Sequence, residues 1–232
     1  MEETDYNYGR FRARYYTLTD FPGPTVGEKA ADFVATALDG QQVRLSDFLG
    51  KKVVLETGSI TCPGYVPRIR SMNEVAQEHP NVVFLELYVR EAHPGSRIPQ
   101  HTSSDEKLAL ANRLPAEEDE NRMILVDDLD GTAHQLYGSL PNVVYIIDEE
   151  GRVAFRMDWN DPEVVDKVLS GEKYDHLVTN DHREPAKSPV AALRVLRRAG
   201  WGAIWDLALS LPKLLMEHRK ASEQALKRKH SD

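Results

Sequence analysis

The chain has 232 residues, enough for one sizeable domain with an extension. Its composition, 41% hydrophobic and 28% charged, is ordinary for a globular protein and excludes wholesale disorder or a bundle of membrane-spanning helices. The net charge of −8 is uneven, because the 10 Lys and Arg and 4 Asp and Glu from Lys187 onward give +6 and leave −14 on the preceding part. The acidic body disfavours nucleic acid as a partner, whereas the basic end suits an anionic surface or the acidic face of its own domain.

The chain contains one cysteine, Cys62, so it forms no internal disulfide, and a reducing compartment is expected. The first residues, MEETDYNYGR, are polar and contain no apolar run of signal-peptide length. The most apolar stretch, residues 199–215, is interrupted by a glycine, an aspartate and a lysine, which makes it a poor membrane-spanning helix. We therefore expect a cytoplasmic protein.

The predicted elements begin after residues 1–22, an N-terminal arm rich in Tyr, Phe and Arg. Two short strands are expected around Phe33 and Val43, joined by an Asp-Gly turn. An apolar run at residues 53–56 predicts a third strand.

A helix is predicted to begin directly after Cys62, because Pro63 suits a first helical turn and apolar residues then recur at helical spacing. A buried strand is expected at residues 81–89, and a loop rich in Gly and Pro follows it. The later elements are, in chain order, a capped helix (103–114), a strand (122–127), a short helix (132–137), a hairpin (142–158) and a final helix (161–169). This order implies an α/β fold, thioredoxin-like, with a mixed central sheet flanked by helices.

The chain is thus expected to divide into four parts. These are the N-terminal arm (1–22), a thioredoxin-like redox domain (23–172), a polar linker (173–188) and a basic amphipathic helical extension (189–232). The extension is predicted to form two helices around Gly200, apolar on one side and basic on the other. Its apolar side either packs on the domain or forms a homodimer or membrane-surface contact.

Cys62 is expected where a buried strand ends and a helix begins. Unpaired amide groups and the positive helix end favour an anion there, so we expect a lowered thiol pKa and a reactive thiolate. A CxxC pair is excluded, because Tyr65 occupies the position of the second cysteine. Once oxidised, Cys62 therefore depends on an external thiol reductant, a small thiol or a thioredoxin-type protein, and no bound cofactor is expected.

A second group of candidate catalytic residues, Tyr88, Glu91 and His93, follows the strand after the Cys62 helix. Ligands of open α/β sheets bind at the carboxyl ends of the strands, where Cys62 is also expected. An imidazole with a carboxylate two residues away can hold and transfer a proton near neutral pH, which complements a thiolate nucleophile. The alternative is that these side chains are simply solvated at a strand end.

Other residues have supporting roles in this prediction. Ser59 and Thr61 flank the cysteine, and their hydroxyls either hydrogen-bond the thiolate or cap the loop. Pro141, before a strand, is a candidate cis proline packed against the cysteine loop. His101 and His134 are expected at the surface, and no second cysteine or close pair of histidines supports a metal site.

Three segments resemble one known family. VVLETGSITCPGYVPRI (residues 53–69) is similar to the active-site segment of iodothyronine deiodinases, with Cys62 where animal members carry selenocysteine. LELYVREAH (85–93) resembles their strand and Glu-Ala-His motif, and ILVDDLDGTAHQLYGSLPNVVYIIDEEGRVAFR (124–156) resembles the remaining half of the domain. After the histidine this chain reads PGSRIP in place of the Asp-Gly-Trp run of the animal enzymes.

The resemblance implies a thioredoxin-like fold and reductive removal of iodine from an iodinated phenol of the thyronine or tyrosine type. It implies that Cys62 attacks the iodine as an exposed nucleophile, and that Tyr88, Glu91 and His93 supply the proton that replaces it. The two flanking hydroxyl side chains belong to the same network by this resemblance.

Two other functions are compatible with the sequence. The segment GEKAADFVATALDGQQVRLSDF (27–48) suits a one-cysteine peroxiredoxin-like peroxidase equally well, with a peroxide as substrate. Peroxiredoxins, however, usually carry a proline seven residues before the cysteine and a threonine three before it, where this chain has Leu55 and Ser59. The third possibility is a non-enzymatic assembly module that uses the helices around Trp201 and Trp205.

Overall fold

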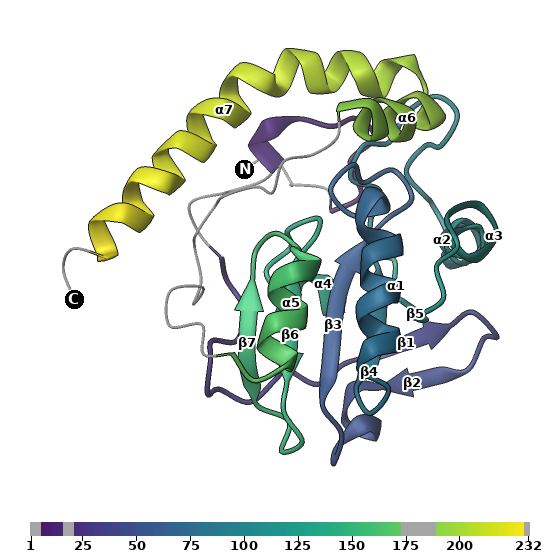
Figure 1. Cartoon of the computed structure of the whole chain (residues 1–232). Coiled ribbons are helices and arrows are strands. Elements are labelled where there is room, and N and C mark those ends of the chain that lie inside the picture. Colours follow the sequence, from purple (N-terminus) through teal and green to yellow (C-terminus); the bar gives the residue numbers. More distant parts are fainter. Residues whose placement is uncertain (1–5, 16–20, 173–188, 230–232) are drawn as a thin grey trace.

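A seven-stranded mixed sheet forms the centre of the part of the chain that the computed structural model describes, residues 6–15, 21–172 and 189–229 (Figure 1). The strands are β1 (Val34–Ala37), β2 (Gln42–Arg44), β3 (Val53–Gly58), β4 (Val83–Tyr88), β5 (Met123–Val126), β6 (Val144–Ile147) and β7 (Val153–Met157). Their order across the sheet is β2-β1-β5-β4-β3-β6-β7, in which β3, β4 and β5 run parallel and the other pairings are antiparallel. The predicted mixed sheet is therefore present.

Strands β3 and β4 bring the candidate site residues together at their carboxyl ends. Both strands are almost entirely buried, as is usual for strands in the middle of a parallel sheet. Their register pairs Gly58 with Tyr88, so the two strands end side by side. Glycine is required at this end of β3, because a Cβ on Gly58 would lie 2.5 Å from the ring of Tyr65.

Helices cover both faces of the sheet (Figure 1). They are α1 (Ile69–Glu78), α2 (Ser104–Ala111), α3 (Leu114–Glu118), α4 (Thr132–Leu136), α5 (Pro162–Leu169), α6 (Pro189–Ala199) and α7 (Trp201–Lys229), with the short 3-10 helices η1 (Ala13–Tyr15), η2 (Leu45–Phe48) and η3 (Val66–Arg68). Val54 and Phe84 pack with α1 and α5 on one face, whereas Leu55 and Leu85 pack with α4 on the other. This alternation follows the two-residue period of a strand.

The helix after Cys62 begins later than the sequence predicts. Residues 60–65 form turns, η3 follows, and α1 begins only at Ile69. Pro67 lies within η3, where it loses no hydrogen bond because the first N–H groups of a helix have no intrahelical partner. The helix predicted over residues 103–114 is also interrupted, and forms α2 and α3.

The two helices predicted around Gly200 are present as α6 and α7. Gly200 has a φ of +123°, and a Cβ on it would lie 2.6 Å from Ser96 Oγ, so the junction requires glycine on both counts. The carbonyl of Ala199 accepts hydrogen bonds from the N–H groups of Arg97 (2.9 Å) and Ile98 (3.3 Å). The end of α6 is therefore docked on the loop that follows β4. The predicted linker lies outside the described residues, and the four-part division of the chain stays a prediction.

Candidate active site

Cys62 lies in the turn that follows β3. Its N–H donates to the carbonyl of Ser59 (3.0 Å), and its carbonyl accepts from the N–H of Val66 (3.1 Å), so the backbone on both sides of the thiol is fixed. The Sγ atom donates to the carbonyl oxygen of Pro141 at 3.6 Å. Pro141 thus meets the cysteine loop as expected, but not as a cis proline.

The Leu140–Pro141 peptide bond is trans, and none of the described residues has a cis peptide bond. The prediction of a cis proline is therefore wrong. A trans bond is the lower-energy form, and here the trans proline already contacts the thiol through its carbonyl oxygen. Thr57 helps to hold this segment, because its hydroxyl donates to the carbonyl of Leu140 (3.3 Å) and accepts from the N–H of Val143 (3.0 Å).

Glu91 joins the cysteine loop to the end of β4. One carboxyl oxygen accepts from both the N–H and the hydroxyl of Thr61, at 3.1 and 2.5 Å. The other accepts from the hydroxyl of Tyr88. Thr61 Oγ1 in turn accepts from the N–H of His93 (3.2 Å), and Ser59 Oγ accepts from the N–H of Ala92 (3.1 Å). The structure therefore brings together the predicted residues of both segments.

Burial sets the protonation of this cluster. Tyr88 and Glu91 are both 0% exposed. Burial raises the pKa of Glu91 above its ordinary value, and the hydrogen bonds from Thr61 and Tyr88 offset only part of that rise. Burial also raises the pKa of Tyr88 well above its ordinary value, and the neighbouring Glu91 carboxylate adds to the effect. Glu91 therefore accepts a proton more readily than a solvated carboxylate does, and Tyr88 retains its own.

The N-terminal arm covers the His93 side of the site. The ring of Phe11 lies on the imidazole of His93, with 4.2 Å between the ring centroids. The hydroxyl of Tyr8 donates to the carbonyl of Ala92 (2.9 Å). Arg10, directly before Phe11, forms an ion pair with Asp206 of α7, at 2.5 and 3.0 Å. The arm therefore spans from the site to the C-terminal helices.

The thiol is buried, contrary to the expectation of an exposed nucleophile. Cys62 is 2% exposed and His93 is 7% exposed. Helix α6 contributes to this enclosure: Val195 belongs to the same buried cluster as Cys62, and Arg198 donates to the carbonyl of Ile60 at 2.8 Å. No local pattern could predict this enclosure, because the segments that enclose the thiol lie far from it along the chain.

Two residues that the sequence analysis did not select also support the site. Gln100 exchanges hydrogen bonds with the backbone N–H and carbonyl of Glu91, at 2.8 and 3.2 Å. Arg68 donates to the carbonyl of Gly64. Burial lowers the pKa of Arg68, and electrostatic attraction to Glu56 and Cys62 opposes that effect, so its positive charge is close enough to act on the thiol.

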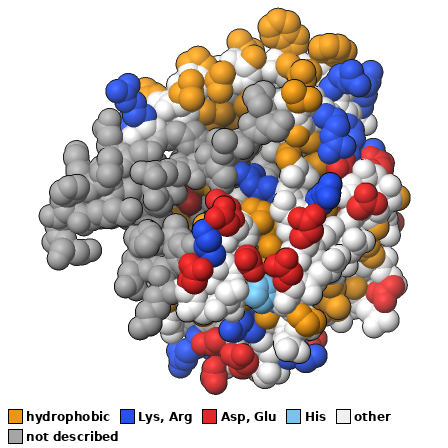
Figure 2. Space-filling view, in the orientation of Figure 1, with side chains coloured by type: hydrophobic (Ala, Val, Ile, Leu, Met, Phe, Trp, Pro, Cys, Tyr) orange, Lys and Arg blue, Asp and Glu red, His pale blue; other side chains and the backbone are white. Residues whose placement is uncertain are grey.

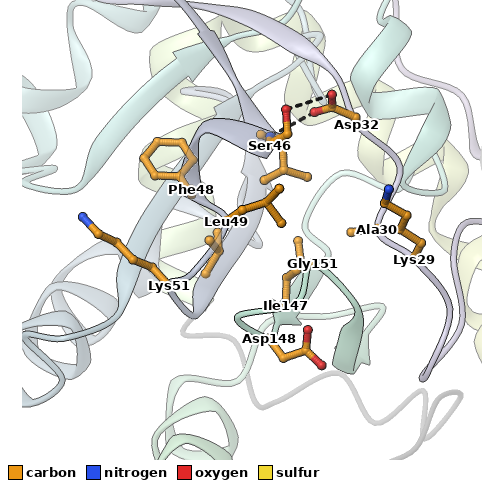
Figure 3. Close-up of a pocket in the computed structure, with 12 residues that line it drawn as sticks. Lys29, Ala30, Asp32, Ser46, Phe48, Leu49, Lys51, Ile147, Asp148 and Gly151 are labelled. Carbon is orange, nitrogen blue, oxygen red and sulfur yellow. Dashed lines mark hydrogen bonds between the residues drawn. The ribbon is translucent and has the colours of Figure 1, made fainter.

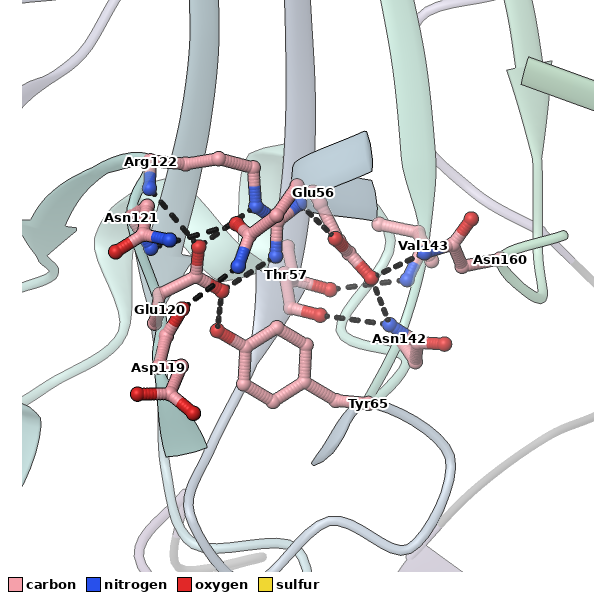
Figure 4. A network of polar contacts seen from close by, with 11 residues as sticks. Glu56, Thr57, Tyr65, Asp119, Glu120, Asn121, Arg122, Asn142, Val143 and Asn160 are labelled. Carbon is pink, nitrogen blue, oxygen red and sulfur yellow. Dashed lines mark hydrogen bonds and ion pairs between the residues drawn. The ribbon is translucent and has the colours of Figure 1, made fainter. Parts of the chain in front are cut away.

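A buried polar network lies behind the cysteine loop (Figure 4). Arg122 forms ion pairs with Glu56 and with Glu120, the latter at 2.5 Å. The hydroxyl of Tyr65 donates to Glu120 (2.7 Å), and the amide of Asn142 donates to Glu56 (2.8 Å). Tyr65 ends the cysteine loop and Asn142 follows Pro141, so the network fixes both segments that contact the thiol.

Glu86 lies beside this network on β4, paired in register with Glu56 on β3. It is 0% exposed, and neither of its carboxyl oxygens has a hydrogen-bond partner among the described residues. Burial, followed by repulsion from Glu56, raises the pKa of Glu86 well above its ordinary value, so we infer that it is protonated at neutral pH. A glutamate within each of the apolar runs VVLET and FLELY was the signal that could have revealed this pair.

His101 and His134 are both buried, so the expectation that they lie at the surface is wrong. His134 is 0% exposed; its Nδ1 interacts with the hydroxyl of Tyr6, and its Nε2 with the carbonyl of Leu140, each at 2.7 Å. The carbonyl only accepts, so Nε2 carries the hydrogen and Nδ1 accepts from Tyr6. Burial lowers the pKa of His134 and of His101 to about 3, which keeps both rings neutral.

A small cavity of about 80 Å³ lies near the start of β3, at the end of that strand opposite to Cys62 (Figure 3). Val53, the first residue of β3, and Ile147, the last of β6, contribute to its lining. Asp32 accepts hydrogen bonds from the N–H and hydroxyl of Ser46 there, both at 3.0 Å. Since Cys62 follows the other end of β3, this cavity takes no part in its chemistry.

In the described ranges, no three His, Cys, Asp or Glu side chains gather closely enough to hold a metal ion. No helix there combines the length and the apolar character needed to cross a bilayer.

The fold resembles that of thiol-disulfide proteins. A putative thiol:disulfide interchange protein DsbE from Chlorobium tepidum aligns with a TM-score of 0.51 at 19% identity, over 64% of this chain and 94% of that one. An uncharacterised conserved protein from Geobacillus kaustophilus aligns with a TM-score of 0.52 at 18% identity, over 66% of this chain and 85% of that one. The predicted thioredoxin-like fold is thereby confirmed, and with one cysteine at the end of β3 it defines a thioredoxin-like protein that lacks a CxxC pair.

The model of the iodothyronine deiodinase family matches residues 10–161. This chain belongs to that family. It is 32% identical to thyroxine 5-deiodinase of Gallus gallus, over 57% of this chain and 56% of the relative, and 28% identical to that of Sparus aurata, over 50% and 47%. The chain thus spans about half the length of the curated relatives that it matches.

Proposed function

We propose that this protein removes iodine reductively from an iodinated phenol of the thyronine or tyrosine type, with Cys62 as the nucleophile and an external thiol as the reductant. The observation that carries the proposal is the pair of hydrogen bonds from Thr61, the residue before Cys62, to the buried carboxyl of Glu91. They support the proposal because they join a buried carboxyl group to the residue next to Cys62. Membership of the deiodinase family supports the same reaction class.

The proposed reaction begins when the Cys62 thiolate attacks the iodine atom. An S–I bond forms, the C–I bond breaks, and its electron pair stays on the ring carbon, which takes a proton and becomes C–H. The ring gains two electrons, and the sulfur is oxidised to a sulfenyl iodide. A reductant thiol then attacks the sulfur, releasing iodide and a proton and leaving a mixed disulfide, and a second thiol restores Cys62.

Tyr88, Glu91 and His93 supply the proton in this proposal. The raised pKa of Glu91 favours proton uptake on the carboxyl that Thr61 contacts, and Tyr88 donates to the same group. His93 is the most exposed of the three, and an imidazole can exchange a proton with a substrate near neutral pH. Ser59 and Thr61 hold the two segments in place through their hydroxyls.

Iodide release tests the proposal. Incubation of the protein with an iodothyronine and dithiothreitol should release iodide, and Cys62→Ser should release none above background. His93→Asn should lower the rate about a hundredfold or more. The matched control is His79→Asn, at the residue that follows α1, whose ring is paired with Asp166 on α5. Iodide release by Cys62→Ser at the wild-type rate would refute the assignment.

A peroxidase is the second candidate, favoured by the 2% exposure of Cys62, because a peroxide reaches an enclosed thiol more easily than a two-ring phenol does. In that reaction the thiolate attacks a peroxide oxygen and the O–O bond breaks. The other oxygen takes a proton and leaves as water or an alcohol, and the sulfur becomes a sulfenic acid. Rapid peroxide consumption, with sulfenic acid on Cys62 and no iodide release from iodothyronines, would establish this activity in place of deiodination.

A further inference from the structure

Helix α7 exposes a broad apolar surface, which we call the outer face. Its most exposed members are Leu209 (77%), Trp205 (65%) and Trp201 (64%). Leu215 and Met216 extend it, at 60% and 50% exposed. Figure 2 shows hydrophobic side chains gathered along the upper edge of the molecule, where α6 and α7 lie in Figure 1. Large apolar side chains exposed side by side mark a contact surface, whereas single ones do not.

The opposite side of the same helix is already occupied. Ala203 is fully buried there, and Asp206 is 7% exposed and paired with Arg10 of the arm. Trp201 and Trp205 are four residues apart, so they lie on one side of the helix. Because the inner side packs on the protein, the outer face is left facing away from the domain.

Basic side chains flank the outer face. Lys213 and Lys220, both exposed, are seven residues apart and therefore lie along one edge of it, and Arg197 is exposed at the end of α6. The acidic side chains that the structure describes on these helices offset them only in part. Asp206 is buried against Arg10, and Glu217 is half-buried and paired with Lys220 at 3.1 Å. The local field of this face is therefore positive.

We propose that the outer face of α7 binds the surface of an anionic lipid bilayer, with the helix lying in the plane of the interface. Tryptophan suits the boundary between headgroups and acyl chains, and lysines beside an apolar face attract anionic headgroups. The −14 charge of the remaining chain is repelled by the same lipids, so it orients the domain away from the bilayer.

Two observations favour lipid over other occupants. A second copy would bring its own positive face onto this one, and like charges across an interface cost binding energy. An acidic partner protein would match the lysines, but a flat row of exposed tryptophan and leucine without acceptor groups suits the continuous, fluid surface of a bilayer. The inference concerns a surface that faces away from the domain, and it does not depend on the thiol chemistry.

Vesicle binding by the full chain tests the inference. We would measure co-sedimentation and tryptophan fluorescence with phosphatidylcholine vesicles and with mixtures containing phosphatidylglycerol. Trp201→Ala/Trp205→Ala should weaken binding at least about tenfold. Its matched control is Val26→Ala/Leu49→Ala, two exposed apolar side chains elsewhere, at 43% and 57% exposed.

The charge contribution has its own pair of variants. Lys213→Gln/Lys220→Gln should weaken binding about fivefold for each lysine removed. Lys29→Gln/Lys51→Gln, at the cavity of Figure 3, is the matched control and should bind as the wild type does. Binding that rises with the anionic lipid fraction, falls with added salt, and shifts tryptophan emission to the blue would support the inference.

Three results would overturn it. The first is no binding to anionic vesicles at low salt, with circular dichroism showing a folded protein. The second is equal binding to neutral and anionic vesicles. The third is a concentration-dependent dimer that the Trp201→Ala/Trp205→Ala change dissociates, without vesicle binding, because the outer face would then join two copies of the chain.

Discussion

Glu56 and Glu86 lie opposite each other on the two central strands, where apolar side chains are usual. Their environments differ. Glu56 has Arg122 as an ion-pair partner and accepts hydrogen bonds from Asn142 and Asn160, at 2.8 and 2.5 Å. Glu86 has no such partner among the described residues and stays neutral by keeping its proton. The protein therefore accommodates one buried charge by pairing and the other by protonation.

This difference predicts how stability depends on pH. Below the ordinary carboxyl pKa of 4.5 both the folded and the unfolded chain hold the Glu86 proton. Above it the unfolded chain releases that proton while the folded chain keeps it, so stability falls, by up to about 1.4 kcal/mol per pH unit, until the raised pKa of the folded state is passed. Glu86→Gln removes this pH-dependent contribution to the free energy of unfolding. Urea unfolding between about pH 5 and about pH 8 should therefore show the stability of the variant rising relative to that of the wild type as the pH rises.

The control for this series is Glu150→Gln, an exposed residue in the β6–β7 turn, which should follow the wild-type curve. Parallel curves for Glu86→Gln and the wild type would show that Glu86 ionises with an ordinary pKa, and would contradict the inference.

Arg68 carries a positive charge that interacts electrostatically with Cys62, and its removal should slow the reactive step. Arg68→Met should lower the thiolate fraction of Cys62 at neutral pH and slow its alkylation by roughly threefold to tenfold. The ultraviolet absorbance of the thiolate, followed against pH, separates this effect from a loss of structure. Arg68→Lys should restore part of the thiolate. Identical titrations of the thiol in all three proteins would exclude the role.

At the scale of elements, the arm and α6 enclose the site from two directions. Phe11 covers His93, whereas Arg198 reaches the backbone of Ile60 beside the cysteine. The arm and α6 therefore both contribute to the burial of this site. The ion pair of Arg10 with Asp206 joins the arm to α7.

Removal of the Phe11 ring should expose His93. Phe11→Ala is expected to increase the rate of His93 modification by diethyl pyrocarbonate several-fold, read by peptide mass spectrometry. Phe48→Ala, a partly buried ring at the remote cavity, is the control and should leave the rate unchanged. If the Phe11 variant is folded and His93 reacts at the wild-type rate, the arm does not limit access to the site.

At the scale of the whole molecule, the single cysteine sets the stoichiometry. Without a reductant, each molecule should convert one iodinated phenol into its deiodinated product and then stop, because no second thiol in the chain can displace the iodine from sulfur. Product should be counted by chromatography against the amount of Cys62. Several turnovers per molecule without added thiol would contradict the mechanism.

Local patterns predicted the elements well. The apolar runs of β3 and β4, the turn of the β6–β7 hairpin and the helices around Gly200 were all visible in the sequence. The start of the helix after Cys62 was misplaced, because Pro63 suits a turn as well as a helix start. The trans bond at Pro141 could not be predicted, since the isomer depends on the surrounding packing.

The site was predicted in part. Cys62 and the Tyr88-Glu91-His93 group were found because they lie at strand ends, where ligand sites form. Their contact through Thr61, the cover from Phe11 and the support from Gln100 depend on long-range packing, which no local pattern encodes.

The enclosure by α6 also has a consequence during protein synthesis. A ribosome makes Cys62 long before Val195 and Arg198, the α6 residues that help to enclose it. A nascent chain whose sheet has already formed therefore presents its thiol to cellular oxidants until translation reaches α6. Slow translation between these points would lengthen that interval and raise the fraction of new molecules that are oxidised before they are complete.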